Sequence, residues 1–109
     1  MLLLVLKKLS KEELEKTSTD LSGYIKFVVD IEMKIMTAGG LRHVEGEELL
    51  LKKGSKQQDL WGGGLDLETD ELDFDSMINL RPSQGNASRE VLDEKIRSQI
   101  EKIVRSMLQ

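Results

Sequence analysis

Apolar and polar residues alternate over residues 24–33, and this period of two is typical of a half-buried β-strand. The face that includes Ile25 is apolar throughout, whereas the other face is mainly polar, with Val28 as its one aliphatic member. A turn near residues 32–34 leads into a second short apolar run over residues 35–38. We therefore predict a β-hairpin in this part of the chain.

Three helices are predicted from caps and from a period close to four. The strongest pattern is an apolar stripe at the C-terminal end, which predicts a helix that is capped by Asp93 or that starts near Ala87. The stripe consists of Leu92, Ile96, Ile100, Ile103 and Met107. Ser-Lys-Glu-Glu at residues 10–13 is a capping box, which predicts a short helix over residues 11–18. Acidic residues early and basic residues late predict a third helix over residues 43–53.

Further strands complete the predicted sheet. Residues 59–67 contain three consecutive glycines, so we expect an irregular or bulged strand there. A turn at residues 68–71 precedes an alternating segment over residues 72–81, which predicts the second strand of another hairpin, and residues 82–88 form a loop. An apolar run at residues 2–6 predicts a first strand. The order β-α-β-β-α-β-β-α predicts one α+β domain with a mainly antiparallel or mixed sheet, built from two hairpins and an N-terminal strand, with helices mainly on one face.

Composition narrows the class of protein. The 109 residues include 20 acidic and 16 basic side chains, a formal net charge of −4 and no cysteine. Disulfides, thiol chemistry and zinc–thiolate sites are therefore excluded. No apolar stretch has the length of a signal-peptide core or a membrane span, so we expect a cytoplasmic protein without membrane contact. The basic residues do not gather along one predicted element, so we expect no duplex nucleic acid partner.

One predicted turn is strongly acidic. Six carboxylates lie within ten positions: Asp66, Glu68, Asp70, Glu71, Asp73 and Asp75. Carboxylate oxygens are ligands that calcium and magnesium accept. The spacing does not fit an EF-hand loop, because Glu71 stands at its glycine position and Met77 at its final glutamate position. The turn is a candidate weak calcium or magnesium site, and the alternative is a solvated hairpin tip without an ion.

A second polar group comes from two predicted strands. Lys26 and Asp30 lie on one of them and Asn79 and Arg81 on another, each pointing away from its apolar face. If these strands are neighbours, the side chains form a cluster that could orient a small anion; the alternative is a structural ion pair. The loop that ends at Asn86 could add backbone N–H groups to an anion, or could serve only as a turn and cap.

His43 is the only histidine and stands at the start of a predicted helix, a position that lowers an imidazole pKa. With Asp30 and Arg81 it could form a catalytic group in which His43 is the general base and Ser55 or Ser76 the nucleophile. No nucleophile elbow surrounds either serine. The alternative for His43 is a capping or packing role.

A set of short motifs lies along the chain from Tyr24 onward. They are Val-Val-Asp-Ile-Glu at 28–32, Ala-Gly-Gly at 38–40, His43, Glu-Glu-Leu-Leu at 47–50, Gly-Ser at 54–55, Asp-Leu-Trp-Gly at 59–62, Ile-Asn-Leu-Arg-Pro at 78–82 and Gly-Asn at 85–86. This set resembles a domain-of-unknown-function family of small archaeal and bacterial proteins. The resemblance implies no activity. Gly63-Gly64 departs from the family pattern, in which a larger polar residue is expected.

No motif specifies a reaction, so two hypotheses of different classes remain open. The first is a binding or interaction module that self-associates, for example as a homodimer, or binds an unidentified protein partner, with calcium or magnesium affinity at the acidic turn. The second is a small enzyme or anion-binding protein that uses Asp30, His43, Asn79 and Arg81. The lack of a catalytic motif favours the first.

Overall fold

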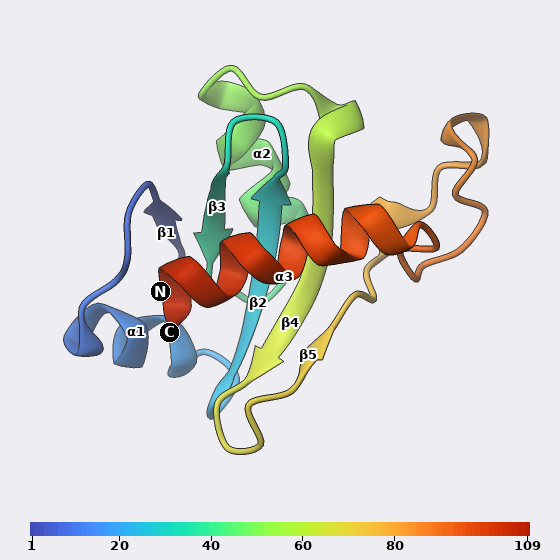
Figure 1. Ribbon diagram of the computed structural model, residues 1–109. Coiled ribbons are helices and arrows are strands. Elements are labelled where there is room, and N and C mark those ends of the chain that lie inside the picture. The colour runs from blue at the N-terminus through green and yellow to red at the C-terminus, as the bar shows by residue number, and fades with distance from the viewer.

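Five strands form one antiparallel sheet in the order β1-β3-β2-β4-β5 (Figure 1). The computed structural model describes residues 1–109. The strands are β1 (Leu3–Val5), β2 (Tyr24–Asp30), β3 (Ile35–Ala38), β4 (Leu60–Asp66) and β5 (Leu72–Asp73). The helices are α1 (Lys11–Ser18), α2 (His43–Lys52) and α3 (Glu94–Leu108). The predicted α+β class, the two hairpins and the N-terminal strand are therefore confirmed.

The sheet is covered on both faces. Ile25 on β2 belongs to the larger apolar core, which α3 covers and to which Leu14 of α1 contributes. Val28, on the opposite face of β2, packs with Leu50 of α2 and Leu60 of β4 in a smaller core. In Figure 1, α3 crosses the front of the sheet and α2 lies behind it. Two of the three helices thus share one face, and the second face of β2 is closed by α2.

The predicted helix caps are present. The Glu13 N–H donates to Ser10 Oγ (3.1 Å), and Glu13 Oε1 accepts from the Ser10 N–H (2.9 Å), so the capping box is formed. Asp93 Oδ1 accepts from the N–H of Lys95 and begins α3. Both caps depend on residues only two or three positions apart, which is why the sequence predicts them.

No helix of the protein has the length and the apolar character that a membrane span requires.

The strand predicted over residues 24–33 ends earlier, at Asp30. The Asp30 carboxylate is fully buried, and its Oδ1 accepts from the N–H groups of Glu32 (3.0 Å) and Met33 (2.9 Å). Its Oδ2 accepts a 2.6 Å hydrogen bond from the Ser55 hydroxyl. Lys34 closes the turn with a positive φ of 58°. An aspartate that bonds backbone groups two and three residues ahead favours a turn over a continued strand.

The strand predicted at residues 59–67 is present as β4, but the expectation that it is irregular or bulged was wrong. β4 is regular, and its register with β2 runs without a break from Tyr24↔Asp66 to Asp30↔Leu60. None of the three glycines has a positive φ. The glycines are required for space, because a Cβ at each position would collide with a neighbouring side chain or carbonyl group. Their lack of a side chain therefore serves close packing and not a change of backbone direction.

The strand predicted over residues 72–81 was also wrong beyond Asp73. β5 covers only Leu72–Asp73, and a 3-10 turn follows at Met77–Asn79. Ser76 caps this turn, since its Oγ accepts from the Ile78 N–H (3.3 Å). Alternation alone cannot reveal such a turn, because the serine and asparagine side chains replace the strand's hydrogen bonds.

Candidate functional site

Asn79 is a structural residue and not a free ligand group. Its side chain is fully buried; Oδ1 accepts from the Gly62 N–H (2.8 Å) and Nδ2 donates back to the Gly62 carbonyl (3.0 Å). Nδ2 also lies 3.1 Å from the carbonyl oxygen of Phe74 and 3.0 Å from that of Arg89. One side chain thus completes the edge of β4 where β5 does not reach it.

Asn86 has a similar role in the next loop. Nδ2 donates to the carbonyl groups of Asn79 (2.8 Å), Ser88 (3.0 Å) and Glu90 (2.9 Å), and Oδ1 accepts from the Leu92 N–H (2.9 Å). The side chain is buried. All its hydrogen-bonding groups are therefore occupied within the protein, so it presents none to an anion.

Arg81 does not pair with Asp30. Its guanidinium donates to the carbonyl of Gln57 and to that of Leu60 (2.7 Å), and its Cζ lies 4.0 Å from the centre of the Trp61 ring. Burial lowers the pKa of Arg81 from its ordinary value. Asp30 holds the β2–β3 turn instead, and neither residue takes part in an ion pair. The predicted cluster of Lys26, Asp30, Asn79 and Arg81 is therefore not formed.

The carboxylates of the acidic turn have separate partners. Asp66 Oδ1 accepts from the Glu68 N–H (2.9 Å), Asp70 pairs with Arg105 (3.7 Å), Asp73 accepts from the Tyr24 hydroxyl (2.5 Å) and Asp75 pairs with Arg89 (3.1 Å). No three histidine or carboxylate side chains converge in a group that could hold a metal ion. The structure does not bring the candidate calcium or magnesium ligands together.

A basic hollow of about 280 Å³ opens beside the first turn of α2. The residues that line this basic hollow are Lys26, Arg42, His43, Val44, Ser76, Met77, Ile78 and Arg89. Its residues come from β2, from the start of α2 and from the two segments that flank residues 79–86. Of the side chains singled out in the sequence, only Lys26, His43 and Ser76 belong to it.

The glycines of β4 make room for this hollow. A Cβ at Gly62 would lie 2.8 Å from Ser76 Oγ and 3.1 Å from His43 Cδ2, so both side chains sit against the bare backbone. Lys26 is on the face of β2 that α2 covers, opposite Gly64 in the register. Gly62 and Gly64 therefore form a flat surface, the glycine floor, beside which His43, Ser76 and Lys26 line the hollow.

The start of α2 is fixed by a carboxylate. Glu45 Oε1 accepts from the N–H groups of Leu41 and Arg42, each at 2.9 Å, and these bonds lower the pKa of Glu45. The N–H groups of His43 and Val44, in the first turn, have no carbonyl partner within the helix. The helix thus presents its positive end where the hollow opens.

The charge at the hollow is opposite in sign to the net charge of the chain, which is −4. Lys26 and Arg42 take part in none of the five ion pairs. Arg89 is paired through Nε with Asp75, which leaves its two terminal nitrogens available. Sequence analysis missed Arg42 and Arg89, because no local pattern relates them to Lys26.

His43 lies with one ring nitrogen against the sheet. Nε2 is 2.7 Å from the Gly63 carbonyl, which can only accept, so Nε2 carries a proton. Burial lowers the pKa of His43 below its ordinary value of 6.5, and Lys26 lowers it further, while the Gly63 bond, Asp73 and Asp75 oppose these effects. The neutral ring therefore has Nδ1 as its free acceptor.

Acid should destabilise the protein through His43. Because its pKa is lowered on folding, the unfolded chain binds the proton more readily, so stability present above pH 6.5 is lost as the pH falls toward the lowered pKa. We expect the free energy of unfolding, measured with urea, to decrease between about pH 7.5 and pH 5. His43→Gln should decrease less over the same range. An equal decrease in both proteins would contradict the assignment.

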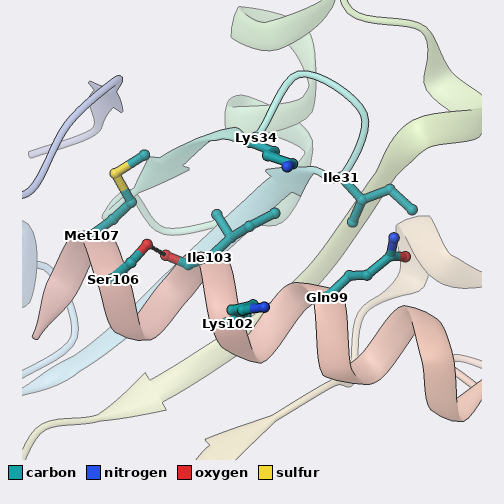
Figure 2. Close-up of a pocket in the computed structure, with 7 residues that line it drawn as sticks. All are labelled: Ile31, Lys34, Gln99, Lys102, Ile103, Ser106 and Met107. Carbon is teal, nitrogen blue, oxygen red and sulfur yellow. Dashed lines mark hydrogen bonds between the residues drawn. The ribbon is translucent and has the colours of Figure 1, made fainter.

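A second, larger hollow of about 430 Å³ lies between α3 and the β2–β3 turn (Figure 2). Its apolar floor is formed by Ile31, Ile103 and Met107, and Lys34 and Lys102 stand at its rim (Figure 2). This hollow is larger than the basic hollow, but no histidine or arginine lines it, so it offers fewer groups that could bind an anion. Its two lysines provide matched controls for the basic hollow.

The fold and the hollow define a small α+β protein with a basic site beside the start of a helix that packs on an antiparallel sheet. The chain belongs to DUF5674, a family of proteins of unknown function, whose family model matches residues 3–107. Comparison with curated proteins and with solved structures found no match. The family resemblance expected from the sequence is therefore confirmed, and it assigns no activity.

Proposed function

We propose that this protein binds a small anionic ligand in the basic hollow. The observation that carries the proposal is the convergence of Lys26, Arg42 and Arg89 around one opening, with Lys26 and Arg42 in none of the ion pairs of the protein. Positive charges gathered at one opening attract an anion, and here only Arg89 has a carboxylate in an ion pair with it, Asp75. An anion in the hollow would remove this repulsion and accept charge-assisted hydrogen bonds.

Calorimetric titration with inorganic phosphate and with sulfate tests the proposal. We expect Lys26→Gln and Arg42→Gln each to weaken binding by about tenfold or more, because a hydrogen bond to a charged group contributes about 1.5–3 kcal/mol. Binding should also weaken as salt rises, because the opening is exposed to solvent.

Lys34→Gln and Lys102→Gln are the matched controls, since each removes one positive charge at the other hollow. They should leave the affinity within about twofold, because exposed charges at a distance are screened. Absence of binding to either anion, or an equal loss in the control variants, would contradict the proposal.

The hypothesis of an interaction module stays a prediction, with its homodimer or unidentified protein partner. The same holds for the absence of enzymatic activity, the cytoplasmic location, and the archaeal or bacterial origin. Calcium or magnesium affinity also stays a prediction, and the separate partners of Asp66, Asp70, Asp73 and Asp75 give it no support.

A further inference from the structure

We infer that the ligand of the basic hollow is a small organic phosphate, with its phosphate group among Lys26, Arg42 and Arg89 and its carbon skeleton against Val44 and Met77. This inference rests on the proposed function, and it adds the chemical class of the anion. Two features of the hollow support it: the number of separate cations, and the apolar wall beside them.

The cations come from three separate segments of the chain. Lys26 projects from β2, Arg42 precedes α2, and Arg89 stands in the segment before α3. A carboxylate has two coplanar oxygens and one charge, which a single arginine can satisfy in a bidentate pair. A phosphate monoester carries about −1.5 to −2 charges on three terminal oxygens. Three cations from different directions therefore match a phosphate better than a carboxylate.

The wall beside the cations is apolar and exposed. Met77 is 62% exposed and Val44 is 42% exposed, and both line the hollow with Ile78. Large aliphatic side chains left in water next to a charged group favour a ligand that carries carbon as well as charge. The wall therefore favours an organic phosphate over inorganic phosphate.

The size of the hollow limits the ligand. Its volume of about 280 Å³ lies just below the usual range for ligand pockets, which is about 300–1,000 Å³. A phosphate group with a few carbons or a single ring fills such a space. The hollow is thus suited to a free small molecule and not to a long chain.

Calorimetric titration with three probes tests the class of ligand. Phenyl phosphate has both a phosphate and an apolar ring, inorganic phosphate lacks the ring, and benzoate has the ring with a carboxylate. We expect phenyl phosphate to bind about tenfold more tightly than either of the others, because it alone combines the charge of a phosphate with burial of a ring face against the apolar wall.

Two surface variants locate the carbon skeleton. Val44→Ser and Met77→Gln change exposed side chains, so they should fold as the parent does, which urea unfolding checks. Each should reduce the affinity for phenyl phosphate toward that for inorganic phosphate and leave inorganic phosphate unaffected. Loss of affinity for both probes alike would overturn the assigned wall.

The outcomes separate the two proposals. Suppose that inorganic phosphate binds and that its binding needs Lys26 and Arg42. If benzoate then binds as tightly as phenyl phosphate, or phenyl phosphate binds no more tightly than inorganic phosphate, the inference fails and the proposed function stands. If none of the probes binds, both fail. The protein should stay in the supernatant when vesicles that contain phosphatidic acid are sedimented. If the protein sediments with these vesicles and does not bind phenyl phosphate, the phosphate belongs to a lipid headgroup and the small-molecule assignment is overturned.

Discussion

Asn79→Ala is expected to lower the free energy of unfolding by about 3–4 kcal/mol, because it leaves several buried backbone groups without partners. The variant removes the acceptor of the Gly62 N–H and the donor shared by the carbonyls of Gly62, Phe74 and Arg89. These groups lie at the uncovered edge of β4, where water would have to enter to replace the amide. For a domain of this size the thermal midpoint should fall by more than about 10 °C.

The matched control is Gln84→Ala. Gln84 is exposed and its side chain donates one hydrogen bond, to the Gln58 carbonyl (2.8 Å), so its loss should cost less than about 0.5 kcal/mol. Urea unfolding of both variants gives the comparison. Similar small losses for the two would show that Asn79 does not hold the β4 edge.

Gly63→Ala is the second large effect, with an expected loss of about 2–3 kcal/mol in the free energy of unfolding. A Cβ at Gly63 would lie 2.7 Å from Phe27 Cζ and closer still to the backbone carbonyl oxygen of Asp73. Neither can move easily, since Phe27 is buried in the core and Asp73 is fixed in β5. The smaller backbone entropy of alanine, worth about 0.5–1 kcal/mol, offsets only part of this cost.

Gly64→Ala provides the comparison. Its Cβ would meet the ring of Tyr24, a half-buried side chain that can turn away at the cost of its hydrogen bond to Asp73. We expect a loss of about 1–2 kcal/mol, because a hydrogen bond to a charged group contributes about 1.5–3 kcal/mol and the smaller backbone entropy of alanine, about 0.5–1 kcal/mol, offsets part of it. The order of the two losses is the decisive result, and a larger loss at Gly64 would contradict the account of the glycine floor.

The glycine floor relates stability to the candidate site. Gly62 and Gly64 lie on the face of the sheet that carries Lys26 and the basic hollow, whereas Gly63 faces the larger core. Variants of Gly62 would therefore push against His43 and Ser76 and disturb the hollow, while variants of Gly63 act on the core. Gly63→Ala should reduce stability without a direct effect on the cations.

Elements with a strong local signal could be predicted from the sequence. The period of α3 and the cap at Asp93, the Ser10–Glu13 capping box and the alternation of β2 depend on residues a few positions apart. Elements whose backbone is completed by distant side chains could not. The segment after Asp73 alternates like a strand, yet Asn79 turns inward to bond Gly62, which is 17 residues away.

The sequence by itself determined the element order, the main caps and the α+β class, because these depend on spacing and on short-range hydrogen bonds. Only the tertiary structure decided which charges meet. Pairing of β2 with β4 places bare glycines beside Lys26, and packing of α2 and of the segment before α3 adds Arg42, His43 and Arg89. Arg42 and Arg89 are far apart in the chain, so the basic hollow follows from the register of the sheet together with the packing of these segments, and from no pattern of neighbouring residues.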